Sequence, residues 1–255
     1  MITYKTTEDF QKMRNAGKVV SNIHYEIYKN TKEGMTLKDL DDIAKNIIEK
    51  SNVVSSFFGY QQPGAKDYPA YICASPNDVI VHGIPNSKII EEGDVLSIDV
   101  GVSYSGYHAD AAFTFGVGKI SQEEQDLIDT TKFALQEAIK LVKDGQKLGT
   151  IGNKIDKIAT RNNLGNVKNY VGHGIGLEMH EEPQVPHFGK KNRGFELKTG
   201  MAICIEPMFN LGSEETKVDE DGWTVRTVDG CKSAHFEHTV GLTEEGVYVF
   251  TENLF

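Results

Sequence analysis

Four acidic side chains occur in apolar segments of this 255-residue sequence, where a carboxylate needs a partner. Asp99 and Asp110 belong to two successive apolar segments, and Glu206 and Glu237 belong to two apolar segments of the second half. A single acid at a strand end usually faces water or bonds to turn amides. Four acids in this setting are difficult to explain as surface charge, so we consider them candidates for one common site.

The residues between Asp99 and Asp110 predict a β-hairpin. Residues 103–106 (Ser-Tyr-Ser-Gly) have the composition of a four-residue turn. Such a turn would place Asp99 directly opposite Asp110, with Cβ atoms ~5 Å apart, where like charges repel. Because no Lys or Arg occurs from residue 89 through residue 115, we expect a metal ion between the two carboxylates.

A histidine adds a nitrogen donor to this set of acids. His173 lies in the glycine-rich segment 172–176, whose backbone permits close approach of neighbouring groups. Four carboxylates and one imidazole suit a pair of divalent ions ~3.5 to 4 Å apart, bridged by carboxylates and a water. The oxygen-rich set favours Mn(II), Fe(II) or Co(II), with Zn(II) as an alternative. The predicted chemistry is metal-assisted hydrolysis, in which a hydroxide between the two ions attacks a carbonyl carbon.

Other catalytic motifs find little support. The glycines of segment 172–176 do not have the spacing of GxGxxG, and the sequence contains no Gly-Lys-Ser/Thr. Residues 180–183 (His-Glu-Glu-Pro) are not HExxH, and no GxSxG elbow is present. Cys73, Cys204 and Cys231 lack CxxC spacing, so we expect them to pack in the interior rather than bind metal.

Helices that could position these residues are predicted by capping boxes, in which a Ser or Thr is followed three residues later by an acid. Three such boxes precede apolar residues at helical spacing: Thr6-x-x-Asp9, Thr36-x-x-Asp39 and Ser121-x-x-Glu124. A fourth, shorter helix is predicted from Leu148 to Ala159. We expect the first helix to end at Gly34 and the third near Gly145. Segments 59–71 and 189–200 have loop composition.

The two halves of the sequence repeat the same pattern. Segments 33–37 and 144–148 match, as do 93–99 and 200–206. Two histidine motifs also recur in the same order: His82-Gly83-Ile84 with His173-Gly174-Ile175, and His108-Ala109-Asp110 with His235-Phe236-Glu237. We therefore predict one α+β domain over residues 1–255, with related halves at about 6–117 and 121–250. An internal pseudo-twofold axis would bring both sets of acids to one central place.

Composition excludes several classes of partner. The formal charge is −10, without a Lys/Arg run, which disfavours sequence-independent nucleic-acid binding. No stretch approaches the ~20 apolar residues that span a bilayer, and charged side chains interrupt the first twenty residues, which disfavours a signal peptide. Three cysteines at wide spacing are typical of reduced thiols. We predict a cytoplasmic protein with neither a nucleic-acid nor a membrane partner.

The ordered motifs resemble those of type I methionine aminopeptidases over nearly the whole chain. The motifs are His82-Gly83-Ile84-Pro85, Asp99, Asp110, Gly172-His173-Gly174-Ile175-Gly176, His180-Glu181-Glu182-Pro183, Ile205-Glu206-Pro207-Met208 and Glu237-His238-Thr239. The resemblance implies the pita-bread (creatinase/aminopeptidase) fold. It also implies a metallo-exopeptidase that removes the N-terminal methionine of nascent polypeptides when the second residue is small. We expect it to meet these substrates at the ribosome, as a monomer.

The same resemblance implies roles for individual residues. The metal ligands would be Asp99, Asp110, His173, Glu206 and Glu237, with Asp110 and Glu237 bridging two ions. His82 and His180 would contact the substrate, and Glu206 would bind one ion and transfer a proton. The methionine pocket would consist of Tyr68, Cys73, Met179 and Trp223.

Two features depart from the family pattern, and both concern the substrate rim. Met179 stands where many relatives have phenylalanine, and the loop 61–67 is longer than usual. The alternatives are an X-Pro aminopeptidase or prolidase of the same fold, which usually carries a large N-terminal domain, and a non-catalytic binding module, which tends to lose ligands. The His82-Gly83-Ile84-Pro85 motif favours the methionine enzyme.

Overall fold

The computed structural model describes residues 2–252 and contains four helices in that range. These are α1 (Thr7–Asn30), α2 (Leu37–Lys50), α3 (Gln122–Ile139) and α4 (Leu148–Arg161). The three predicted capping boxes are confirmed at the starts of α1, α2 and α3, where each Ser or Thr side chain accepts a backbone N–H and each acid returns a bond. Within residues 2–252, no helix has both the length and the apolar character needed to cross a membrane.

The two glycines expected to end helices lie beyond them. Helix α1 ends at Asn30 and α3 ends at Ile139, so both predicted ends were too late. Gly34 and Gly145 instead occupy the turns that lead into α2 and α4, with φ of 87° and 76°. This left-handed conformation favours glycine, which explains its presence in both turns.

The strands form four sheets in the described chain. The first sheet has the strand order β1 (Val54–Ser55), β4 (Val95–Tyr104) and β2 (Cys73–Pro76). Its fourth strand, β5 (Tyr107–Gly116), also pairs with β4. The second has the order β15 (Gly246–Val249), β14 (His238–Thr243), β9 (Ala202–Ile205), β7 (Gly172–Gly174), β8 (Glu181–Val185). Two small sheets are β13 (Ser233–His235), β10 (Met208–Asn210), β6 (Gly165–Asn166), and β11 (Thr216–Val218), β12 (Val225–Thr227), β3 (Val79–Val81).

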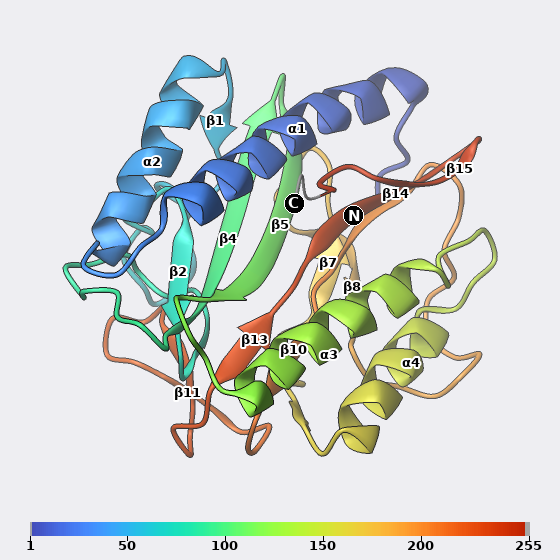
Figure 1. The fold of residues 1–255 in the computed structure, drawn as a ribbon. Coiled ribbons are helices and arrows are strands. Elements are labelled where there is room, and N and C mark those ends of the chain that lie inside the picture. The colour runs from blue at the N-terminus through green and yellow to red at the C-terminus, as the bar shows by residue number, and fades with distance from the viewer. Residues whose placement is uncertain (1, 253–255) are drawn as a thin grey trace.

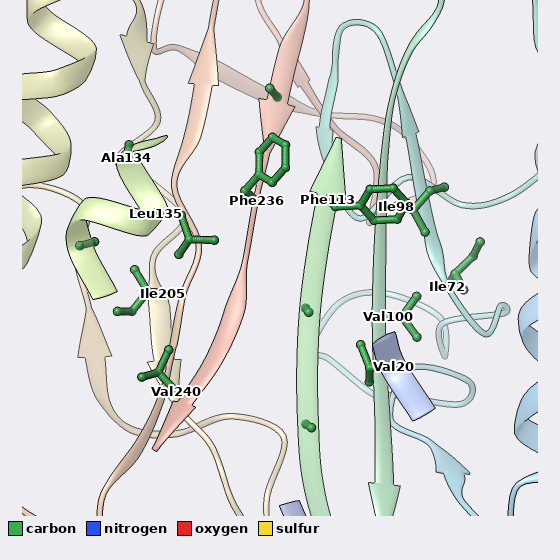
Figure 2. Packing of buried hydrophobic residues seen from close by; sticks show 14 of the residues in the cluster. Val20, Ile72, Ile98, Val100, Phe113, Ala134, Leu135, Ile205, Phe236 and Val240 are labelled. Carbon is green, nitrogen blue, oxygen red and sulfur yellow. The ribbon is translucent and has the colours of Figure 1, made fainter. Parts of the chain in front are cut away.

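Helices cover both halves of this strand arrangement (Figure 1). Helix α1 packs on β4 and β5, and α3 packs on α4 and the second-half strands. One hydrophobic cluster runs through both halves, and Figure 2 shows Phe236 between Leu135 of the second half and Phe113 of the first. The helices therefore cover the outer side of strands whose other side is available for the acids.

The two halves meet where β5 runs beside the segment 235–239. Thr239 Oγ1 accepts from the Asp110 amide at 2.8 Å and donates to the Asp110 carbonyl at 2.7 Å. Two residues along, the Glu237 amide donates to the Ala112 carbonyl at 2.8 Å. The segments around Asp110 and Glu237 thus run antiparallel to each other, which brings the two acids together at the junction of the halves.

The predicted register of the β4–β5 hairpin was wrong by two residues. The turn is the two-residue Ser105-Gly106, with φ of 49° and 83°, so Asp99 lies opposite Ala112 and Asp110 opposite Gly101. Two positive φ values are typical of the short hairpin turn whose twist matches that of the strands, which explains why it replaces the expected longer turn. Asp99 and Asp110 are diagonal neighbours on one face rather than direct partners.

Candidate metal centre and substrate pocket

A cavity of about 380 Å³ opens at the junction of the two halves. All eleven residues predicted for the site contribute to its lining. They are Tyr68, Cys73, His82, Asp99, Asp110, His173, Met179, His180, Glu206, Trp223 and Glu237. Residues that lie far apart in sequence thus meet in one place. The cavity lining combines acids and imidazoles with aromatic side chains.

The four acids of the cavity are largely removed from water. Asp110 and Glu237 are 3% and 2% exposed, Asp99 is 9% exposed, and Glu206 is partly buried. Burial raises the pKa of Asp110 to about 7, and burial followed by repulsion from neighbouring acids raises the pKa of Asp99, Glu206 and Glu237 well above the ordinary range. No Lys or Arg is among the lining residues described, so the acids lack a protein cation to neutralise them.

Tight backbone packing fixes the position of His173. A β-carbon on Gly172 would lie 2.3 Å from the Cys204 carbonyl oxygen, and one on Gly174 would lie 2.3 Å from that of Glu182, so both positions require glycine. His173 Nδ1 lies 2.9 Å from the Gly174 carbonyl, which can only accept, so Nδ1 carries the proton. The free lone pair of Nε2 faces Glu206 Oε1 at 3.7 Å and Glu237 Oε1 at 4.0 Å.

The donor atoms gather as metal ligands do. One ligand atom from each of Asp110, His173, Cys204 and Glu237 lies within 4.8 Å of the others. Asp99 is outside this group, but its carboxyl group interacts directly with that of Asp110. Asp99 Oδ1, Asp110 Oδ1 and Glu237 Oε1 are buried without a hydrogen-bond partner in the part of the chain that the structure describes. Unpartnered buried oxygens beside an imidazole nitrogen fit divalent cations, which would satisfy and neutralise them together.

Cys204 lies among these potential metal ligands, but its thiol does not have the properties of a ligand. Its thiol is fully buried, and its Sγ lies 3.5 Å from Thr239 Oγ1. Burial, followed by the negative charge of Glu237, raises the pKa of this thiol well above its usual value. A thiol kept protonated is a poor ligand, which agrees with its predicted role in packing.

Two buried histidines behind Glu206 escaped the sequence analysis. The Glu206 amide donates to His187 Nε2 at 3.3 Å, and His187 is fully buried. His235 Nε2 lies 3.9 Å from Glu206 Oε2. Burial lowers the pKa of both imidazoles to about 3, so both are neutral. His235 was visible in the repeat with His108, but its proximity to Glu206 depends on a contact between β13 and β10.

His82 and His180 stand on the substrate side of the cavity. His82 is half-buried and has a φ of 59°, a left-handed conformation that is uncommon for a non-glycine residue and often marks functional sites. Burial and then His180 lower the pKa of His82 to about 4. His180 is exposed, its Nδ1 lies 2.7 Å from the Tyr60 hydroxyl, and its ring centre lies 4.4 Å from that of His173.

Aromatic and sulfur-containing side chains form the apolar part of the cavity. The rings of Tyr68 and Trp223 meet edge to face at 5.1 Å, and the Tyr68 hydroxyl donates to the Ile72 and Gly83 carbonyls at 3.1 and 3.0 Å. Cys73 is the strand partner of Asp99, which places the pocket beside the acids. A β-carbon at Gly101 would lie 2.8 Å from Phe57 Cε1 and 3.1 Å from Met179 Cε, so a larger residue there would crowd the pocket.

The loop 61–67 lies over the pocket and is tied to it. Trp223 Nε1 donates to the Lys66 carbonyl at 2.7 Å, and Gln62 Nε2 donates to the Gly222 carbonyl at 3.0 Å. Five further lining residues were not predicted: Phe57, Tyr60, Val81, Tyr170 and Val171, whereas Gln61, Gln62 and Pro63 belong to the loop 61–67 that was expected at the substrate rim. The many aromatics of segment 59–71 were the available signal for this wall.

Comparisons with known proteins identify the family and agree with the fold. Residues 11–244 match metallopeptidase family M24. Methionine aminopeptidase 1 of Bacillus subtilis is 42% identical over 251 residues, covering 98% of this chain and 99% of the relative. Methionine aminopeptidase of Aquifex aeolicus is 43% identical over 250 residues, covering 96% of each.

Solved structures separate the candidate families. Methionine aminopeptidase of Thermotoga maritima superposes with a TM-score of 0.95 at 38% identity, covering 99% of this chain and 100% of that chain. Prolidase of Pyrococcus furiosus superposes with a TM-score of 0.78 at 21% identity, and the match covers 99% of this chain and 66% of the prolidase chain. That likeness concerns the fold alone. The predicted pita-bread fold is confirmed, and the chain belongs to metallopeptidase family M24 and, within it, to the methionine aminopeptidases.

Proposed function

We propose that this metallo-aminopeptidase removes the N-terminal methionine with divalent ions held by Asp99, Asp110, His173, Glu206 and Glu237. The observation that carries the proposal is the set of buried carboxylate oxygens without hydrogen-bond partners, grouped with His173 in a cavity whose described lining has no basic side chain other than histidine. Two ions, with Asp110 and Glu237 contributing to both, would suit four carboxylates because they would balance the negative charge. Mn(II), Fe(II) or Co(II) fits this oxygen-rich set, with Zn(II) as the alternative.

Divalent ions bound here supply a Lewis acid for the substrate carbonyl and lower the pKa of water. The protein side chains do the rest. Glu206, whose pKa is raised by burial and by Asp110 and Asp99, can accept a proton on its carboxylate and deliver it to the departing amine. His82 and His180 border the same cavity, where each can hydrogen-bond the scissile amide or the developing oxyanion.

Tyr68, Cys73, Met179 and Trp223 give the substrate methionine an apolar, sulfur-tolerant pocket. A single methylene is worth only ~1 to 3 kcal/mol in such a pocket, so norleucine should be a slower substrate. Exclusion of bulky second residues would come from the rim, where the loop 61–67 is fixed by its bonds to Trp223 and Gly222. The free α-amine would take an open metal position, so blocked N-termini should fail.

We further propose that residues 1–255 form one domain with related halves at about 6–117 and 121–250. The shared core and the bonds of Asp110 and Glu237 across the junction support this division. The buried thiols of Cys73 and Cys204 suit a reducing cytoplasm, where nascent polypeptides at the ribosome would be the substrates of a monomeric enzyme.

Peptide selection tests the proposed function. With Mn(II) or Co(II) added, Met-Ala-Ser should be cleaved and Ala-Pro-Ala should not, and Met-Leu-Ser should be cleaved far more slowly than Met-Ala-Ser. Equal cleavage of the Ala and Leu peptides would show that the rim does not exclude large second residues. Preference for Ala-Pro-Ala would overturn the assignment in favour of an X-Pro peptidase.

A further inference from the structure

His235 is a buried imidazole that the proposed reaction does not use. It ends strand β13, it is 2% exposed, and its Nε2 has no hydrogen-bond partner among residues 2–252. It is absent from the described lining of the cavity but lies next to Glu206, which is part of that lining. A neutral imidazole nitrogen is costly to bury unless it is satisfied, so this atom points to a partner that the described residues do not supply.

The distances around His235 fit metal ligation better than a hydrogen bond. Its Nε2 lies 3.9 Å from Glu206 Oε2, beyond the ~3.2 Å reach of an N–H···O bond. Two ligands that are each ~2.1 Å from one ion lie ~3 to 4.2 Å apart, depending on the angle between them. Ligand atoms of Glu206, His235 and Glu237 all lie within 4.8 Å of one another.

Glu206 has an imidazole nitrogen near each of its oxygens. His173 Nε2 lies 3.7 Å from Oε1, and His235 Nε2 lies 3.9 Å from Oε2. The two histidines therefore lie near different oxygens of the Glu206 carboxylate. A metal held only by the five residues proposed above would leave His235 Nε2 unsatisfied.

The backbone of His235 is fixed in this position. Its amide donates to Thr114 Oγ1 at 2.9 Å, and its carbonyl accepts from the same hydroxyl at 2.7 Å. Ser97 Oγ lies 2.7 Å from Thr114 Oγ1 and completes the chain of bonds within the core. A rigid backbone of this kind holds a ligand at low entropic cost.

We propose that His235 Nε2 is an additional metal ligand, acting with Glu206 and Glu237 on an ion that these two carboxylates share. The inference rests on the proposed metal centre and extends it, giving the centre two imidazole nitrogens, from His173 and His235. A second nitrogen ligand would strengthen the binding of Fe(II), Co(II) and Zn(II), which imidazole suits, relative to Mn(II).

Proton NMR of the Co(II)-loaded protein tests this directly, because an imidazole bound to paramagnetic Co(II) gives a hyperfine-shifted, solvent-exchangeable ring N–H signal. We expect two such signals from the wild type. His235→Gln should lose one and His173→Gln the other. His108→Gln is the matched control, because His108 occupies the repeat-related position but its Nδ1 already pairs with Ser56 Oγ at 2.7 Å. It should keep both signals.

The possible results distinguish a failure of the His235 proposal from a failure of the metal centre itself. A single signal, lost in His173→Gln and kept in His235→Gln, would overturn the role of His235 and leave the metal centre standing. The absence of any shifted signal after Co(II) addition would contradict the metal centre itself. If His235→Gln does not fold, ¹⁵N-histidine spectra of the wild-type protein titrated with Zn(II) provide the test. The Nε2 resonance of His235 should shift when Zn(II) binds. A resonance that does not shift would overturn the proposal.

Discussion

His108 and His235 occupy related positions in the two halves, each two residues before a central acid, yet their surroundings differ. His108 Nδ1 pairs with Ser56 Oγ, and the His108 amide donates to the Gly176 carbonyl at 2.8 Å. His235 is almost fully buried, and its Nε2 has no hydrogen-bond partner among the described residues. The internal repeat therefore determines where an imidazole stands, while local packing determines whether its nitrogen remains available. The duplicated acids, Asp110 and Glu237, stay equivalent because both lie on the junction of the halves.

The equivalence of these acids predicts the largest effect. Asp110→Asn and Glu237→Gln should each lower kcat/KM for Met-Ala-Ser by more than ~100-fold, since even groups that only support a ligand change metal affinity or activity by 10 to 100-fold. The metal-free Asp110→Asn protein should melt at the same temperature as wild type or higher, because one of several repelling acids is gone. Normal turnover in either variant, or collapse of the metal-free Asp110→Asn protein, would contradict the paired arrangement.

His82 and His173 are a second pair of histidines at related positions in the two halves, and we expect their roles to differ. We place His173 on the metal and His82 on the substrate, together with His180. His82→Ala and His180→Ala should therefore lose ~10² to 10³ in rate and still bind metal as wild type does. Titration calorimetry with Mn(II) or Co(II) checks this, and loss of one bound ion in either variant would move that histidine into the ligand set.

His235→Gln and His108→Gln give the direct contrast between the halves. Competition with a chelator should show Co(II) affinity lowered by ~10 to 100-fold in His235→Gln, and within twofold of wild type in His108→Gln. Equal affinities in the two variants would mean that the unpartnered nitrogen of His235 has no part in metal binding.

The smallest expected effect is a pH dependence of the metal-free protein. Burial raises the pKa of Asp110 to about 7 from an ordinary 3.8, and the pKa of Glu206 and Glu237 also rises. The folded state then binds more protons than the unfolded state, so the free energy of unfolding falls as pH rises through the raised values. Between about pH 7 and about pH 8 the histidines of the unfolded chain are mostly neutral, which isolates the acids.

Thermal unfolding between these pH values measures the effect. The metal-free wild type should lose up to ~1.4 kcal/mol per pH unit for each acid still protonated, and Asp110→Asn should lose less. Added Mn(II) should remove the trend because the ions bind the ionised carboxylates. Metal-free protein that becomes steadily more stable over this interval would show that the acids are already ionised.

Local signals predicted much of the fold. The capping boxes placed the starts of α1, α2 and α3 correctly, because the bonds of a box lie within four residues. The β4–β5 register was missed because two turns of different length fit the same residues, and the choice of Ser105-Gly106 depends on strand twist.

The site was predictable to the extent that it follows motifs. All eleven predicted residues reach one cavity, although their individual roles remain predictions. The contacts of His235 with Glu206, and of Tyr60 with His180, join segments distant in sequence and needed the structure. A lone histidine or tyrosine in a sequence carries no signal of such a partner.

Cleavage by this protein should depend on bound divalent metal. Protein freed of metal by chelation, and verified by elemental analysis, should not cleave Met-Ala-Ser. Its activity should return on stepwise addition of Mn(II), Fe(II) or Co(II), because buried carboxylates grouped with His173 need cations to act. Full turnover of Met-Ala-Ser by protein that contains no metal would contradict the account.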